Sequence, residues 1–295
     1  MISLQQICID FISRNIYCVE SLNDTPELIG QMLAESITGC GNSTAEQRAR
    51  VDECVLLFTK AYGDVALHSL NLESSYELIL HKNGTANKMC QTLRQSVFNI
   101  ISFDQLKQLD VSFCTAFSST EWLDVLGQCS LTHLSLNGVG LNDTSLIFLT
   151  TCSAVRKSGL CSLEYLNLSN NNLSPKCLKR VHRFDKLKVC VLSNTLIRPC
   201  DVDPGMWSVS DDSSHIYNIK GRGWLADYIE SMCGKSKGLG FYQQRTNRPH
   251  SGSMMIMLKR SRKRNISVEA AKLSQHFSES SKKKQTDSDI FNLYS

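Results

Sequence analysis

The sequence has little of what would place it outside ordinary globular proteins. Five prolines and sixteen glycines among 295 residues exclude a collagenous or proline-rich chain. No apolar run reaches the roughly 18 residues of a membrane helix, and the first residues lack the basic and apolar regions of a signal peptide. No Cys-x-x-Cys pair and no Cys/His set has zinc-ligand spacing. We therefore expect a nuclear or cytoplasmic protein with reduced thiols and without a metal or other cofactor.

The charge of the sequence is divided unevenly. The whole chain has a formal net charge of +4. Residues 241–295 carry eleven Lys or Arg against four Asp or Glu, a net of +7, so residues 1–240 have a net of −3. All thirteen cysteines precede residue 241. This division predicts a folded body, in which the cysteines are small core residues, and a disordered basic tail over residues 241–295.

Leucines recur at a fixed spacing in the middle of the sequence. The pattern LxxLxLxxNxL fits residues 163–173 at every fixed position, and looser copies start at Leu106, Leu131 and Leu187, with a faint one at Leu67. The steps between the clear copies, 24 to 32 residues, are those of leucine-rich repeats, in which successive short strands stack and turn alternate leucines inward. We therefore predict an α/β fold, a short leucine-rich-repeat solenoid over residues 63–200.

Both ends of such a solenoid expose core and need covering. In residues 1–62 the apolar positions follow the 3.6-residue period of amphipathic helices, which predicts an α-helical N-terminal cap. Residues 201–240 contain a polar stretch and then an amphipathic segment at residues 223–233. We expect these residues to form the C-terminal cap, closed by that helix.

Side chains that alternate with the buried leucines are predicted to line the concave face, where solenoids commonly bind partners. They are small, polar and almost uncharged, unlike a basic nucleic-acid surface. An ordinary solvated face is the alternative interpretation. The predicted partner-binding residues are Gln108, Asp110, His133, Ser135, Asn137, Tyr165, Asn167 and Ser169.

The first helix holds another candidate site. Ser3 is followed directly by Leu4, and Cys8 and Ile12 come four and eight residues after Leu4. This spacing matches the elongin-binding box of cullin ubiquitin-ligase receptors. One helix face would then dock in a groove of the partner. Residues 25–33 resemble the accompanying cullin-selecting box, with a threonine where an apolar residue is usual. Packing of these apolar side chains on the solenoid is the alternative.

Two basic clusters stand in the predicted tail. Their spacing resembles a bipartite nuclear-localisation signal, which implies recognition by importin. Weak contact with nucleic acid and a purely solubilising role are the alternatives. The clusters consist of Lys259, Arg260, Arg262, Lys263 and Arg264, and of Lys282, Lys283 and Lys284.

The order of these features resembles the leucine-rich repeat-containing protein 42 family. The resemblance implies a leucine-rich-repeat fold and no established enzymatic activity, and we expect this chain to lack the leading extension of that family. We therefore predict a non-enzymatic protein-interaction module, with a ubiquitin-ligase substrate receptor as the alternative. The resemblance depends on the repeats and on the segments Ser3–Leu4, Phe11–Ser13, Phe58–Gly63, Gly223–Trp224, Phe241–Tyr242 and Asp287–Tyr294.

Overall fold

The structure is a computed structural model of the chain. It describes residues 3–39, 51–73, 97–101, 103–151, 153, 155, 158–210, 216–232 and 257–260. The chain divides into two compact units between Lys259 and Arg260. Apart from Arg260, all described residues belong to the first unit.

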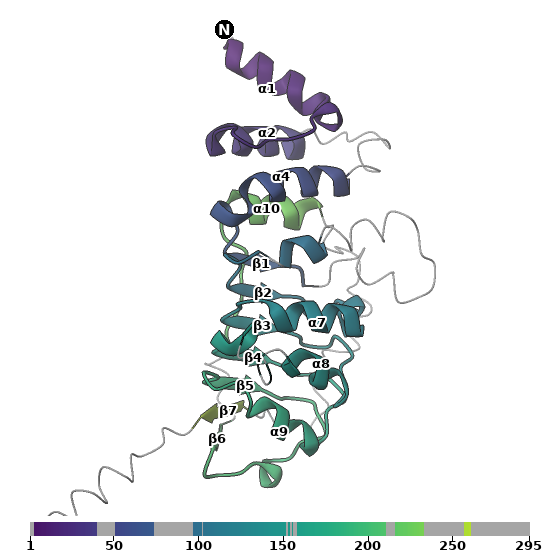
Figure 1. Cartoon of the computed structure of the whole chain (residues 1–295), viewed down its shortest axis with the longest axis vertical. Coiled ribbons are helices and arrows are strands. Elements are labelled where there is room, and N and C mark those ends of the chain that lie inside the picture. Colours follow the sequence, from purple (N-terminus) through teal and green to yellow (C-terminus); the bar gives the residue numbers. More distant parts are fainter. Residues whose placement is uncertain are drawn as a thin grey trace, which may run out of the picture. The chain divides into compact units, whose positions relative to one another are not determined.

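A mostly parallel sheet runs through this unit (Figure 1). Its strands lie in the order β1-β2-β3-β4-β5-β7-β6, and β1 to β5 are parallel to one another. The faint repeat at Leu67 therefore supplies a strand of its own. The parallel strands are β1 (Ser69–Asn71), β2 (Gln108–Asp110), β3 (His133–Ser135), β4 (Tyr165–Asn167) and β5 (Val189–Val191).

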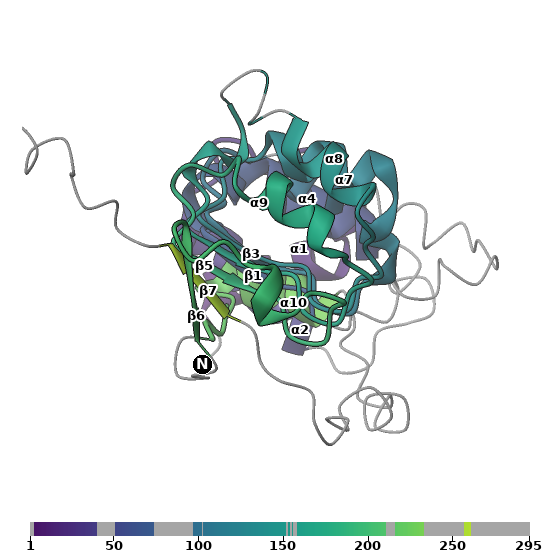
Figure 2. The same cartoon turned by 90° about the horizontal axis from the view of Figure 1, so that it is seen from below.

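The repeat spacing determines the pairing of the strands. Their central residues, Leu70, Leu109, Leu134, Leu166 and Cys190, are aligned across the sheet and fully buried. Helices α7 (Thr120–Gln128), α8 (Ser145–Thr151) and α9 (Leu178–Val181) lie on the other side of the core (Figure 2). The result is a mixed α/β fold consistent with leucine-rich repeats. Short 3₁₀ helices complete the turns at Ile16–Cys18, Thr115–Ser118, Leu160–Ser162, Pro175–Cys177 and Pro199–Asp201.

Helices predicted in the first 62 residues are present where the structure describes them. They are α1 (Leu4–Arg14), α2 (Glu27–Gly39) and α4 (Val51–Ala66). The hydroxyl of Ser3 caps α1 by accepting a hydrogen bond from the Gln6 backbone N–H. None of the helices in the described ranges is long and apolar enough to cross a membrane.

The amphipathic segment near residue 223 forms the predicted helix, α10 (Trp224–Met232), but not where we expected it. It packs against α4 and α2, beside β1, instead of closing the far end of the sheet. Phe58 and Tyr228 bring their ring centroids to 4.8 Å, and Trp224 Nε1 donates to Glu27 Oε1 at 3.0 Å. The apolar face of α10 predicts that this helix is buried. It does not predict the end of the solenoid at which the helix packs, because both ends expose core residues.

Two strands follow the repeats, β6 (Trp207–Ser210) and β7 (Met257–Arg260). β7 lies between β5 and β6 and pairs antiparallel with β5. Because Met257 and Leu258 are fully buried, the prediction of a disordered tail is wrong for these four residues. The charged composition of the tail concealed a local apolar run at residues 254–258.

Candidate protein-interaction surfaces

Six of the eight predicted concave-face residues fall into two aligned rows, and Asn137 and Ser169 follow the ends of β3 and β4. Gln108, His133 and Tyr165 pair in register at the first positions of β2, β3 and β4. Asp110, Ser135 and Asn167 pair in the same way at the last positions. Ser69 and Asn71 extend both rows onto β1, where the faint repeat gave no basis for naming them.

A segment of the same chain covers the first row. We call residues 216–222 the strap, because they cross the strands from Tyr165 of β4 to β1, where α10 begins. The Tyr217 ring lies 4.4 Å from His133, centroid to centroid, and its backbone N–H donates to Tyr165 Oη at 3.3 Å. Tyr165 is only 4% exposed. The alternative of an ordinary solvated face is therefore wrong at this position.

The strap is held more firmly at β1. Ser69 Oγ donates to the Lys220 carbonyl, and Asn71 Nδ2 donates to the Ile219 carbonyl at 2.8 Å. The Asn71 backbone N–H donates to Glu230 Oε1 of α10 at 2.8 Å. The strand positions that sequence reasoning missed thus anchor both the strap and the helix that follows it.

Polar side chains of the second row bond mainly to one another and to nearby backbone. Ser112 Oγ lies 2.5 Å from Asp110 Oδ1 and 2.9 Å from Ser135 Oγ, and all three residues are buried. Farther along the face, Asn170 Nδ2 donates to Asn137 Oδ1 at 2.7 Å, and Ser169, also buried, donates its backbone N–H to Asn167 Oδ1. These residues therefore stabilise the turns after the strands.

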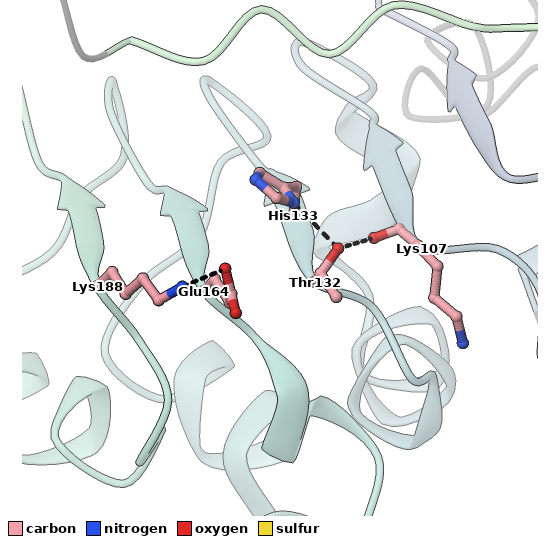
Figure 3. Close-up of polar contacts among 5 residues, drawn as sticks. All are labelled: Lys107, Thr132, His133, Glu164 and Lys188. Atoms are coloured by element: carbon pink, nitrogen blue, oxygen red, sulfur yellow. Dashed lines mark hydrogen bonds and ion pairs between the residues drawn. The ribbon is translucent and has the colours of Figure 1, made fainter.

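At the first position of β3, the surroundings of His133 favour its neutral form. Burial lowers the pKa of His133, which outweighs the opposing influence of Glu164, while Lys188 lowers it further. Thr132 Oγ1 lies 3.0 Å from both the Lys107 carbonyl and His133 Nδ1 (Figure 3). The carbonyl only accepts, so when the hydroxyl donates to it, the contact with His133 requires the imidazole proton on Nδ1. Lys188 and Glu164 pair at 2.7 Å beside this site.

The first helix turns an apolar face toward solvent. Leu4, Ile7 and Phe11 are 76%, 54% and 69% exposed, and Cys8 is exposed beside them. Ile12, the third residue of the predicted elongin box, is partly buried against the core instead. The alternative in which all the box residues pack on the repeats is thus wrong for Leu4 and Cys8. Sequence reasoning did not assign Ile7 and Phe11 to this outer face.

Comparison with known proteins identifies relatives of one kind. Leucine-rich repeat-containing protein 42 of Xenopus tropicalis is 30% identical over 207 residues, which cover 66% of this chain and 44% of that protein. The chain is a distant homologue of leucine-rich repeat-containing protein 42. The Danio rerio protein is 29% identical over 204 residues (66% and 45%), and the Homo sapiens protein 30% over 203 residues (65% and 42%). The family resemblance found in the sequence is therefore confirmed.

The relationship to leucine-rich repeat-containing protein 42 does not extend over those whole proteins. The chain spans less than half the length of these three relatives. No protein-family model matches the chain, and no solved structure matches it either. The comparisons therefore give a family relationship without a defined biochemical role.

The structure describes only the beginning of the predicted nuclear-localisation signal. Lys259 and Arg260 belong to β7, where Lys259 pairs with Val189 of β5. The other residues of both clusters, Arg262 to Arg264 and Lys282 to Lys284, lie outside the described residues. Within the described part of the chain, no three His, Cys, Asp or Glu side chains come together as a metal site.

Proposed function

We propose that this chain is a short leucine-rich-repeat solenoid that acts as a non-enzymatic protein-interaction module. The observation that carries the proposal is the outward apolar face of α1, formed by Leu4, Ile7, Cys8 and Phe11. Side chains at these spacings lie along one side of a helix and fit an apolar groove of a partner. Contiguous apolar surface of this kind marks interaction sites on soluble proteins.

The polar residues beside this face indicate the character of the groove. Gln5 and Gln6 are exposed. Gln6 Nε2 donates to Asp10 Oδ1 at 3.0 Å, so one oxygen of this carboxylate already has a hydrogen-bond partner within the helix. Arg14 is the basic residue in the last turn. With so little charge around the helix, we propose a partner whose groove is apolar and whose rim is nearly uncharged.

Affinity purification of the full chain with quantitative mass spectrometry tests this surface. The Ile7→Ser/Phe11→Ser variant should recover at least about ten-fold less of its specific partner, because two side chains that anchor the interface are removed. Leu196→Ser is the matched control, because Leu196 is equally apolar and exposed but lies after β5. An unchanged set of partners in the double variant would refute the role of α1.

We further propose that the basic clusters direct the protein to the nucleus through importin. The support is their bipartite spacing in the sequence. Fluorescence microscopy of the full chain tests this with Arg262, Lys263 and Arg264 replaced by alanine, which leaves β7 untouched. Loss of nuclear accumulation is expected, and unchanged accumulation would exclude this signal.

A substrate receptor of an elongin/cullin ubiquitin ligase is the second candidate function. Exposure of Leu4 and Cys8 favours it, since both positions of the box are available to a partner. Partial burial of Ile12 counts against it. Binding of purified elongin to the full chain separates the two functions, because Leu4→Ser/Cys8→Ser should abolish it and Leu196→Ser should not. If elongin does not bind the unmodified chain, the ligase function is excluded.

A further inference from the structure

The concave face holds a tyrosine of its own chain in a defined slot. Gln108, His133 and Tyr165 supply the slot from three adjacent strands, and Tyr217 of the strap fills it. We infer that this slot is a tyrosine-recognition site, which takes an extended, tyrosine-containing segment of a partner protein when Tyr217 leaves it. This inference goes beyond the proposed function, whose surface is the apolar face of α1.

The slot reads the phenol group by hydrogen bonds. Gln108 Nε2 lies 3.2 Å from Tyr217 Oη, and Gln108 Oε1 lies 3.5 Å from the same oxygen. A side-chain amide both donates and accepts, so it matches a hydroxyl, which does the same. A phenylalanine in the slot would replace this direct contact by contact of the exposed amide with water. The slot therefore favours tyrosine over phenylalanine.

Two aromatic rings and one backbone contact complete the recognition. The Tyr217 ring lies 4.4 Å from His133 and 5.8 Å from Tyr165, within the range of favourable aromatic pairs. Tyr165 Oη accepts the Tyr217 backbone N–H. That N–H is present in any non-proline residue, so the contact orients an extended main chain without selecting its sequence.

Electrostatics in the slot suit an unmodified tyrosine. Burial lowers the pKa of His133, which favours its neutral form, and the ammonium group of Lys188 is paired with Glu164. Of the three described side chains that form the slot, none supplies a cationic group that would hold a phosphate group. The partner segment that fits the slot therefore carries an unphosphorylated tyrosine.

The strap is held unequally along its length, which allows Tyr217 to leave. Ile219 is fully buried and its carbonyl is bonded by Asn71, whereas Tyr217 remains 38% exposed. The firm half adjoins α10, whose contacts with Phe58 and Glu27 do not involve Tyr217. Tyr217 can therefore leave its slot while α10 stays in place. The slot itself persists, since its three side chains are positioned by paired strands.

Fluorescence anisotropy with a labelled peptide of the strap sequence, residues 216–222, tests the inference on the full chain. Tyr217→Ala empties the slot and should strengthen binding of the peptide at least about ten-fold over the unmodified chain, because the internal competitor is gone. Asn218→Ala, at an exposed strap position, is the matched control and should leave the affinity unchanged. Peptides with phenylalanine, phosphotyrosine or alanine in place of Tyr217 should each bind the emptied slot more weakly.

Two results with the Tyr217→Ala chain would overturn the inference. One is equal affinity of the Tyr217→Ala and unmodified chains, which would make the contact internal packing only. The other is equal or tighter binding of the phenylalanine or phosphotyrosine peptide. Tyr217→Phe retains the ring and serves if Tyr217→Ala fails to fold, and it should still bind the tyrosine peptide more tightly than the unmodified chain does. Absence of that gain would also refute the slot. Loss of the α1 partner leaves these peptide measurements unaffected, so the two proposals fail separately.

Discussion

Asn171 occupies the fixed Asn position of the most regular repeat, and replacing it with alanine should be among the most destabilising single changes in the protein. Its Oδ1 accepts from the backbone N–H groups of Gly140 and Leu141, both at 2.9 Å. Its Nδ2 donates to the carbonyls of Leu136, Leu168 and Ser169 at 2.8, 2.9 and 3.0 Å. The side chain is 5% exposed, so water does not reach these groups in its place.

The size of the effect follows from counting the groups that lose their bonds. Gly140 is exposed, and the Ser169 carbonyl also accepts from Gly138, so these two groups lose least. The N–H of Leu141 and the carbonyls of Leu136 and Leu168 remain as buried groups without Asn171. At about 1–3 kcal/mol for each unsatisfied buried group, taken near the lower limit because the turn relaxes, Asn171→Ala should lower the free energy of unfolding by about 3–5 kcal/mol.

Equilibrium urea unfolding followed by tryptophan fluorescence measures this change, because Trp122 and Trp207 are buried in the folded state. Thr195→Ala is the matched control at the same position of the next repeat. Thr195 Oγ1 donates to the Leu192 carbonyl at 2.8 Å and accepts weakly from Ile197 at 3.4 Å, so its loss should cost only about 1 kcal/mol. Equal costs for the two variants would refute the argument that the asparagine supports the turn backbone.

Three other results are expected. Exposed Cys8 should react with a thiol reagent in the native protein. Cys129 and Cys177 are buried, which raises the pKa of each thiol to about 12, and they should react only on unfolding. Mass analysis in which all three reacted together would contradict this. Because burial lowers the pKa of His133, its imidazole binds a proton more readily in the unfolded chain than in the folded one. The free energy of unfolding should therefore decrease as the pH is lowered from about 8 to about 5. His133→Gln should lose that share of the pH dependence, and an unchanged profile would contradict it. Leu258→Asp should release β7 and speed amide hydrogen exchange in β5 while β1 to β4 stay protected; unchanged exchange would show that β7 does not protect this edge.

The repeats were predictable because their spacing has a direct physical meaning. A leucine at every second strand position can be buried on one face of a stack, and even the faint copy at Leu67 proved to contain β1. The candidate rows on the concave face followed from the same alternation. Gln108, His133 and Tyr165 are therefore neighbours, as the register predicted.

The coverings of the repeats were not predictable, since the local sequence does not state what an apolar residue will touch. In α1 apolar residues occur on both sides, and their pattern does not predict that Ile9 is buried while Phe11 is exposed. Tyr217 follows the polar stretch at residues 201–215, and its contact with His133 depends on where the distant α10 packs. β7 has only four residues in a basic segment, so its apolar residues hardly change the average composition from which the disordered tail was predicted.

The return of α10 to the first helices has a consequence for how the protein folds. An open array of repeats behaves almost one-dimensionally, and its terminal units fray independently. Here the bond between Asn71 and Glu230 joins residues 159 positions apart, and the bond between Glu27 and Trp224 joins residues 197 positions apart. Such contacts raise the contact order, which slows folding, and they link the first and last parts of the body into one cooperative transition. A protein that closes its chain in this way gives up the gradual unfolding of an open array.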